Sequence, residues 1–500
     1  DEEPPRGPNE DAVRIALQFA ELVGAKVVEE IHFMRKVVVD GSNTSGFQRT
    51  GLIATGGNIE YNGKILELDQ LCLEEDSCRH GDESNEYLLD RLGIPLLEIT
   101  TKPQLNDSVD VQYAAKAIGR LLRACNVKRG LGTIRQDVNV SVDNGQRVEL
   151  KGFQDLSSMP KVVENEVRRQ TALNKIERGN IGQVTVVNDC FKEKKEFAQA
   201  LRIDKWKGIL GNKNSPENHV RMGKELADYA RRAGMNGIMH SDELPAYGID
   251  IDETDKIKRK LKCKENDAFI LIFGKEKKVE NAMNLVIERI KTSGVPAEVR
   301  KVTPKNLTKY LRPMPGASRM YPETDIAPFK LSNINVLKPK TLDEREKNLP
   351  LNDEESKQLV NRELDERFTY LNAKYELPKL ISRILLHTLP QLKDEGQNIS
   401  NSDLEKVLNL FKDGKLVKEG IPKALIQSSN NEKIEINRGN IELEVNEFIS
   451  DLIKDREEFV REKGMGAVGA LMGPVMSEFR GKMDGGEINK ILMKKIKEIL

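Results

Sequence analysis

The side chains between residues 138 and 151 alternate strictly, and this alternation constrains the fold more than any other feature of the sequence. Valines alternate with polar residues from Val138 to Val142, Asn144-Gly145 is a strong signal for a tight turn, and the alternation resumes at Val148 and Leu150. Such a pattern predicts an antiparallel hairpin whose Val/Leu face packs inward. The opposite face would carry polar residues, namely Asp137, Asn139, Ser141, Glu149 and Lys151.

This polar face has two interpretations. An exposed sheet face is usually polar, so contact with solvent accounts for it in the ordinary case. Its mixture of acidic, amide and cationic groups would also suit the floor of a site that binds the phosphates of a nucleotide. The hairpin alone does not decide between the two.

A second stretch, residues 73–103, places carboxylates beside an apolar run. Glu74 and Glu75 are followed by Asp76, and after a polar loop the run Ile94-Pro95-Leu96-Leu97 ends on Glu98. A charge buried alone is costly, so Glu98 should have a cationic partner. Mg²⁺ takes carboxylate oxygens together with substrate phosphates, which suits this acidic set. A solvated acidic turn and an edge-strand Glu98 paired with Lys or Arg fit about equally well.

Size and composition set the outer limits. A chain of 500 residues exceeds what one core usually supports, so three or four domains are expected. The 80 basic and 80 acidic residues argue against binding nucleic acid by bulk charge but allow a local basic patch. The five cysteines form no CxxC pair, which indicates a reducing compartment. No apolar run is long enough to span a bilayer, so we expect a soluble, cytoplasmic protein without a membrane partner.

Several helices can be placed from periodicity and caps. Helices are expected over 10–23 and after a cap at Asp107 or Ser108, and a strand over 27–40. The composition changes near residue 191, and an α+β block follows with helices over 224–233 and 278–292 and a buried strand over 267–273. In its loop 234–249, His240 and Asp242 invite a metal or catalytic interpretation, but a structural role is the more usual one.

The last third is predicted to be helical. Amphipathic patterns cover 352–375, 378–392 and 402–412, and the Ser/Asn-rich residues 427–433 are expected to be a linker. Glycines at 464, 466, 469 and 473 would let helices approach closely. A terminal helix over 488–500 places lysines largely away from its apolar side, and these are Lys490, Lys494, Lys495 and Lys497.

Five segments resemble the B/E-type subunits of tRNA-dependent amidotransferases. They are HFMRKVVVDGSNTSGFQRTGLIATGG (32–57), LEEDSCR (73–79), YLLDRLGIPLLEI (87–99), GTIRQDVNVSV (132–142) and ELKGF (149–153). The resemblance runs over nearly the whole chain, and the motifs are long and ungapped. The α+β block also resembles the inserted domain that E-type subunits share with bacterial-type aspartyl-tRNA synthetases.

The resemblance implies a multidomain α+β fold. Its catalytic cradle of mixed and antiparallel sheets would occupy residues 1–190 and return over 311–340, with the inserted α+β domain at 191–310. An all-α helical domain would follow at 341–432 and a helical tail domain at 433–500. The segment 312–328, rich in proline, would close the cradle or serve as a rigid linker.

The resemblance also implies an activity. Members of the family use ATP and Mg²⁺ to phosphorylate the γ-carboxylate of glutamate esterified to tRNA(Gln), and ammonia then displaces the phosphate to give Gln-tRNA(Gln). Because no amidase arrangement is evident in this chain, an asparaginase-like amidase subunit, the D-type partner of the family, would supply the ammonia. A heterotetramer with two copies of each subunit is expected.

Residue roles follow by position in the matching motifs. Metal ligands would be Glu74, Glu75 and Glu98, and the catalytic set would be Glu75, Glu98, Arg79 and Lys151. ATP and phosphate contacts would come from Ser45, Arg135, Asp137, Asn139 and Glu149. The tail lysines Lys490, Lys494, Lys495 and Lys497 would contact tRNA phosphates, since lysine adds affinity that does not depend on sequence.

One departure from the family concerns the first residues. DEEPPRGPNED has no initiator Met, and the family's opening Gly-Leu-Glu-(Ile/Val)-His strand is not found, so we expect an N-terminal piece to be absent. If the chain truly starts at Asp1, the site lacks ligands. Two other classes stay open: a tRNA-binding scaffold without catalysis, and a synthetase-like enzyme that would release AMP.

Overall fold

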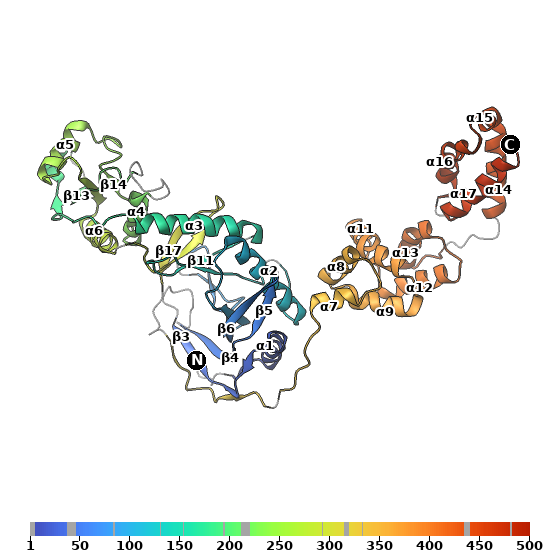
Figure 1. Ribbon diagram of the computed structural model, residues 1–500, viewed down its shortest axis with the longest axis horizontal. Helices are drawn as coiled ribbons and strands as arrows, with labels where there is room; N and C mark the ends of the chain where they lie inside the picture. Colours follow the sequence, from blue (N-terminus) through green and yellow to red (C-terminus); the bar gives the residue numbers. More distant parts are fainter. Residues whose placement is uncertain are drawn as a thin grey trace. The chain divides into compact units, whose positions relative to one another are not determined.

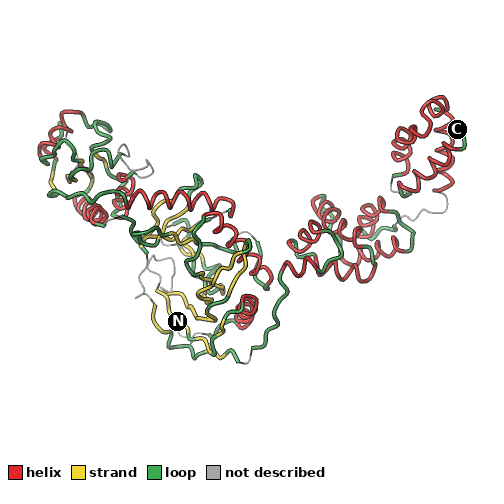
Figure 2. Tube along the Cα trace, viewed as in Figure 1, coloured by secondary structure: helices red, strands yellow, loops and turns green. Residues whose placement is uncertain are grey.

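The computed structural model describes residues 6–37, 47–83, 86–130, 132–153, 155–193, 196–211, 221–292, 294–314, 320–332, 334–434, 441–480 and 483–500. The chain forms two compact units, Asp1–Pro339 and Lys340–Leu500. The first unit contains α-helices and β-sheets, and the described elements of the second are all helical (Figure 2). None of the described helices has the length and apolar character needed to cross a membrane.

A seven-stranded antiparallel sheet, here called the first sheet, forms the body of the first unit. Its strands lie in the order β18-β3-β4-β6-β5, with β1 beside β4 and β9 beside β6. Helices α1 (Glu10–Val23) and α2 (Ser108–Ala124) pack on it around a core that includes Phe19, Ile53 and Leu71 (Figure 1). The strands are β1 Lys26–Val27, β3 Phe33–Val37, β4 Phe47–Thr55, β5 Asn58–Tyr61, β6 Lys64–Glu75, β9 Pro95–Thr101 and β18 Met320–Pro322.

The second sheet contains the predicted hairpin. Its order is β10-β11-β16-β17, with β11 parallel to β16 and the other two pairs antiparallel. Helix α3 (Met159–Asn174) packs on the face of Val148 and Leu150, and Asn139 is exposed on the other, so the prediction of a two-faced hairpin is confirmed. The strands are β10 Val138–Val140, β11 Val148–Lys151, β16 Glu298–Val302 and β17 Thr308–Pro313.

A third sheet, β12-β13-β15-β14, is formed within residues 185–291, here called the inserted segment, which lie between α3 and β16. Its core is continuous with that of the second sheet, since Leu150 and Ile270 belong to one cluster of buried side chains. The pairing of β16 with β11 returns the chain to the second sheet at Glu298. The strands and helices are β12 Thr185–Val186, β13 Phe197–Ile203, β14 Met239–His240, β15 Ala268–Gly274, α4 Met222–Arg232, α5 Ile251–Lys260 and α6 Glu276–Lys291.

Short elements complete the first unit. Two-stranded pairs form between β2 and β19 and between β7 and β8. These elements are β2 Glu30–Ile31, β7 Arg79–His80, β8 Tyr87–Leu88, β19 Phe329–Lys330 and the 3₁₀ turns η1 Leu156–Ser158 and η2 Asn188–Cys190.

The second unit has two apolar clusters. One includes Leu359, Phe368 and Leu425, and the other includes Val445 and Leu492. The helices are α7 Leu342–Lys347, α8 Asp353–Asn361, α9 Asp365–Tyr375, α10 Pro378–Arg383, α11 Leu389–Asp394, α12 Asn401–Lys412, α13 Ile421–Ser429, α14 Ile441–Asp455, α15 Glu457–Lys463, α16 Ala467–Phe479 and α17 Gly485–Lys497. Its other turns are the π segment η5 Ile384–Thr388 and the 3₁₀ turns η6 Lys418–Gly420 and η7 Gly464–Gly466.

Some element predictions were wrong in extent. The amphipathic run 352–375 is broken at Glu363, whose φ of +57° is incompatible with a continuing right-handed helix. The strand expected over 27–40 is divided into short pieces, of which the last described one ends at Val37. The expected linker 427–433 begins inside α13, which continues to Ser429.

The glycines of the tail do not mediate a close approach among the described atoms. A Cβ added at Gly466, Gly469 or Gly473 would have no described atom within 4 Å, and at Gly464 only Leu500 at 3.9 Å. The prediction of glycine-dependent helix contacts there was therefore wrong. The terminal helix does bury Ile488, Leu492 and Ile496, as its pattern predicts.

The sequence left two candidates for the cap of α2, and the structure selects Asp107. Its carboxylate accepts hydrogen bonds from the backbone N–H groups of Val109 (2.7 Å) and Asp110 (3.4 Å). Asp107→Ala should lower the free energy of unfolding by about 1 kcal/mol, the usual cost of losing an N-cap. Trp206, the only tryptophan, packs in the same cluster as Val111 of α2, so its fluorescence during urea denaturation would report the change. Ser108→Ala is the matched control, and an equal loss in that variant would contradict the assignment.

Candidate functional site

Strand β6 ends on two consecutive carboxylates that point to opposite faces of the first sheet. Successive side chains of a strand alternate between faces. Glu74 lies opposite Thr50 of β4 and Leu96 of β9, whereas Glu75 lies opposite Pro95. The predicted metal set is therefore brought together only in part, since Glu75 is separated from Glu74 and Glu98.

Glu74 and Glu98 form the acidic part of one face, here called the carboxylate face. Glu98 lies directly opposite Cys72, two residues before Glu74, and the two carboxyl groups are within hydrogen-bonding reach. Lys36 of β3 forms an ion pair with Glu74, which is nearly buried. Lys36 was not selected from the sequence, although it lies inside the first segment that carries the family resemblance.

The pKa of Glu98 is raised. The largest cause is partial desolvation, and the next is the negative charge of Glu74. The residue keeps contact with solvent, so the desolvation acts on only part of the carboxylate. The charges of Lys36 and Lys151 act in the opposite direction. Burial and the same two carboxylates raise the pKa of the Cys72 thiol to about 12, so this thiol stays protonated at neutral pH.

Glu98 was expected to have a cationic partner. Among the described residues no ion pair reaches it, and the compensation comes from the charges of Lys36 and Lys151 at longer range. β9 pairs only with β6 among the described strands, so Glu98 does lie on an edge strand. Glu74 and Glu75 belong to β6 itself, which excludes the alternative of a solvated acidic turn.

Glu75 is neutralised on the other face. Arg49 of β4 binds its carboxylate with both Nε, at 2.7 Å, and Nη2, and Gln48 donates to its backbone carbonyl at 2.9 Å. Nearby, Arg35 binds Glu323 through Nε at 2.6 Å and Nη2 at 2.8 Å. A carboxylate held by a two-pronged guanidinium contact has its charge compensated within the protein.

Asp76 joins two loops at the end of β6. Arg91 donates to its carboxylate from Nε at 2.7 Å, and Arg135 contacts the same oxygen at 3.4 Å. The backbone of Asp76 is also hydrogen-bonded to Gly93 and Ile94. Arg135, one of the predicted phosphate contacts, is thereby held loosely beside the carboxylate end of β6 with 53% of its side chain exposed.

The polar face of the hairpin holds a second group of predicted residues. Lys151 lies 2.5 Å from a carboxylate oxygen of Asp137 and 2.5 Å from one of Glu149. Desolvation alone would lower the pKa of Lys151, but the hydrogen bonds and charges of the two carboxylates outweigh it and raise the pKa. Lys151 is therefore a fixed positive charge, and Asn139 lies beside it, opposite Glu149 in the register.

The two sheets bring these groups close to each other. Lys151 of the second sheet is near enough to Glu98 of the first for its charge to lower the pKa of that carboxyl. Predicted residues from two separate sequence motifs, 87–99 and 149–153, thus lie within range of each other's charge.

The remaining predicted residues lie away from the carboxylate face and the hairpin, or outside the described residues. Ser45 is outside the described residues, and for Arg79 only the backbone of β7 is described. Lys490, Lys494 and Lys497 are exposed on α17 and Lys495 is half-buried, all in the second unit. No three His, Cys, Asp or Glu side chains converge as metal ligands within the described part of the chain. The metal and tRNA roles stay predictions.

His240 and Asp242 have structural surroundings. The carboxylate of Asp242 accepts hydrogen bonds from the backbone N–H groups of Gly208 (2.9 Å) and Gly211 (2.8 Å). His240 is buried, and burial lowers its pKa. Asp242 thus shapes the turn before residue 211, which agrees with the structural interpretation of this loop.

Comparison with known proteins gives a consistent result over the whole chain. The family model for the GatB/GatE catalytic domain matches residues 3–336, and that for the GatB domain matches residues 366–496. The chain is 41% identical to the E subunit of the glutamyl-tRNA(Gln) amidotransferase of Methanocaldococcus jannaschii, 40% to that of Methanococcus maripaludis and 39% to that of Archaeoglobus fulgidus. Each alignment covers 100% of this chain and 86% of the relative.

The raised pKa of Glu98 predicts a pH-dependent stability. Between its unfolded and folded pKa values the folded protein holds the extra proton, so the protein loses stability as the pH rises through this window. Glu98→Gln removes the titration and should raise the free energy of unfolding at pH 7 by no more than about 1 kcal/mol, because the site is partly exposed. The two proteins should become equally stable below about pH 4.3, the unfolded pKa of glutamate. Urea denaturation at a series of pH values measures this.

Glu67→Gln, on the neighbouring strand β6, is the matched control. The hydrogen bond and charge of Lys102 lower the pKa of Glu67, so its contribution is present at neutral pH and lost as the pH falls. The Glu67→Gln protein should therefore be less stable than the wild type at pH 7. A Glu98→Gln protein that followed the same pH trend as the control would contradict the raised pKa.

Proposed function

Since the chain belongs to the GatB/GatE family, we propose that it is the subunit of a tRNA-dependent amidotransferase that uses ATP to activate glutamate on tRNA(Gln). An amide does not form from a carboxylate and ammonia without activation. The γ-carboxylate oxygen of the esterified glutamate attacks the γ-phosphorus of ATP, which releases ADP and leaves an acyl phosphate. Ammonia then attacks the acyl carbon, and phosphate departs to give Gln-tRNA(Gln).

The observation that carries the proposal is the carboxylate face with its opposing cation. Glu74 and Glu98 are two carboxylates within reach of each other, and their mutual repulsion contributes to the raised pKa of Glu98. Glu74 and Glu98 would hold Mg²⁺ through their carboxylate oxygens, and substrate phosphates would be its further ligands. Bound there, Mg²⁺ would neutralise charge that develops on the phosphoryl oxygens. Glu75 is a less suitable ligand, because Arg49 binds both of its oxygens on the other face, whereas Lys36 contacts one oxygen of Glu74.

The cations of the second sheet suit phosphate binding. Phosphoryl transfer depends mainly on positioning and charge neutralisation. Asp137 and Glu149 hold the ammonium group of Lys151 in place and keep it charged. Arg135, half exposed and held only loosely by Asp76, has donors left for a phosphate oxygen.

Partners follow from the same chemistry. The reaction consumes ammonia, and we propose that an asparaginase-like amidase subunit releases it from glutamine, in a complex of two copies of each subunit. Contacts to tRNA phosphates would come from the exposed lysines of α17, whose apolar side is buried in the second unit.

The decisive experiment combines the chain with the amidase subunit, ATP, Mg²⁺, glutamine and Glu-tRNA(Gln), and follows Gln-tRNA and the nucleotide products. Gln-tRNA formed together with ADP would support the proposal. Tight tRNA binding without ADP would mean a scaffold subunit, and release of AMP would mean synthetase-like chemistry. Either result would overturn it.

Two substitutions test the site itself. Glu98→Gln and Lys151→Met should each lower kcat for ADP formation by about 10²–10³-fold, the usual effect of removing one group that stabilises the transition state. Glu67→Gln, on the same sheet but paired with Lys102, is the control and should retain full activity. A Glu98→Gln protein with normal kcat would remove the carboxylate face from the mechanism.

A further inference from the structure

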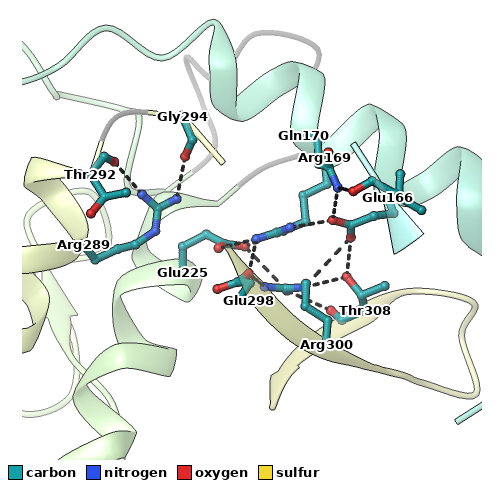
Figure 3. Close-up of polar contacts among 11 residues, drawn as sticks. Glu166, Arg169, Gln170, Glu225, Arg289, Thr292, Gly294, Glu298, Arg300 and Thr308 are labelled. Carbon is teal, nitrogen blue, oxygen red and sulfur yellow. Dashed lines mark hydrogen bonds and ion pairs between the residues drawn. The ribbon is translucent and has the colours of Figure 1, made fainter. Parts of the chain in front are cut away.

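The strongest polar cluster outside the site lies on the buried side of the second sheet. We call it the Arg169 network, and its members come from α3, α4, β16 and β17 (Figure 3). They are Glu166, Arg169, Glu225, Glu298, Arg300 and Thr308, all buried. None of these side chains takes part in the proposed chemistry.

Arg169 is the centre of the network. Its guanidinium binds both carboxylate oxygens of Glu225 at 2.9 and 2.8 Å, and it also donates to Glu166 at 2.8 Å and to Glu298 at 2.9 Å. Glu225 lies on α4, a helix of the inserted segment, whereas Arg169 lies on α3, which packs on the second sheet. The guanidinium therefore ties the inserted segment to that sheet.

Arg300 continues the network through the sheet. Its Nη1 donates to Glu298 at 2.5 Å, and its Nε donates to the hydroxyl of Thr308 at 2.8 Å. The same hydroxyl donates to Glu166 at 2.7 Å, which closes the circuit back to α3. The circuit ties β16 and β17 to α3.

A neighbouring side chain attaches β10, the other edge strand of the second sheet, to the network. Gln170, also on α3, donates to the carbonyl of Val140 in β10 at 3.2 Å and to Glu166 at 3.0 Å. The sheet order is β10-β11-β16-β17, so both neighbours of β11 are attached to this one cluster.

Strand β11 carries Lys151 on its other side. In the register, Glu298 lies beside Val148 and Arg300 beside Leu150, which are the inward-facing residues of β11. Glu149 and Lys151 alternate with them and face the candidate site. The network and the phosphate-binding group are thus on opposite faces of the same strands.

We propose that Arg169 and Glu225 are positioning residues, through which helix α4 of the inserted segment fixes the strand that carries Lys151. The inference rests on the proposed function for its kinetic consequence. A buried ionic cluster is a weak source of stability, because desolvation of the charges offsets their attraction. What it supplies is a single geometry, since the guanidinium of Arg169 is held by three carboxylates at once and a mispaired charge would be buried alone.

The test uses Glu225→Gln in the complete complex. The substitution keeps the size of the side chain but removes the charge that holds Arg169. We expect kcat for ADP formation to fall about tenfold and KM for ATP to rise several-fold, in the range seen when a group supporting a ligand is removed, with KM for Glu-tRNA unchanged. Amide hydrogen exchange should become faster in residues 138–151 and stay unchanged in β13 and β15.

These readouts separate positioning from mere stability. A purely structural role would lower the amount of active protein and so reduce the apparent kcat. It would leave every KM and the amide exchange of residues 138–151 unchanged, and that result would overturn the proposal. Asp365→Asn is the matched control, because it breaks the two-pronged Arg345–Asp365 pair of the second unit and should leave both KM values and this exchange unaltered.

A second variant and the wild-type control cover the cases in which Glu225→Gln gives no answer. If Glu225→Gln does not fold, Arg169→Lys keeps the positive charge but removes the two-pronged contact with Glu225, and the same readouts decide. If the wild-type complex forms no ADP, the proposed function fails. The exchange measurement still decides whether the network positions β11.

Discussion

The parallel pairing of β11 with β16 is the contact on which the second sheet, and with it the position of Lys151, depends. Without β16, the β10–β11 hairpin would be two-stranded, and an isolated hairpin is marginally stable in water. Parallel neighbours require a long crossover. Here the crossover consists of α3 and the inserted segment with its own sheet, so this segment is part of how the second sheet is completed. The position of Lys151 thereby depends on residues far from it in sequence.

Strand β6 shows how one element serves two purposes. Glu75 is compensated by Arg49 on one face and has no charge to offer an external ligand. On the other face, Glu74 is paired with Lys36, and its charge helps to raise the pKa of Glu98, which has no ion-pair partner among the described residues. A carboxyl group with a perturbed pKa is found more often at functional sites than elsewhere. The two consecutive glutamates of β6 thus have different surroundings, although they are chemically identical.

Local patterns in the sequence predicted the elements well. Helix α1 has the predicted bounds, 10–23, and the two-faced hairpin follows from alternation alone. Motif resemblance selected Glu98 and Lys151, which the structure brings close to each other. The opposite orientation of Glu74 and Glu75 could in principle have been predicted, because consecutive residues of a strand face opposite ways. The prediction required knowing that β6 continues through Glu75.

Other features depend on distant contacts and could not be read from the sequence. The Arg169 network joins residues from four elements, and no local pattern marks Arg169, Glu225 or Arg300 as buried. The break at Glu363 was missed because an amphipathic period continues across it on both sides. The tail glycines were misjudged for a related reason: small residues permit close packing but do not indicate which surface approaches them.

The two clusters of charge differ in a way that bears on function. In the Arg169 network the carboxylates of Glu166 and Glu225 are bonded directly to Arg169, and the circuit closes within buried residues. Such a cluster has little tendency to attract an outside ion. At the candidate site the compensation is less complete: among the described residues Glu98 has no ion-pair partner, and Arg135 keeps 53% of its side chain exposed beside Asp76. An outside ligand can therefore contact these two groups without displacing a strong internal ion pair.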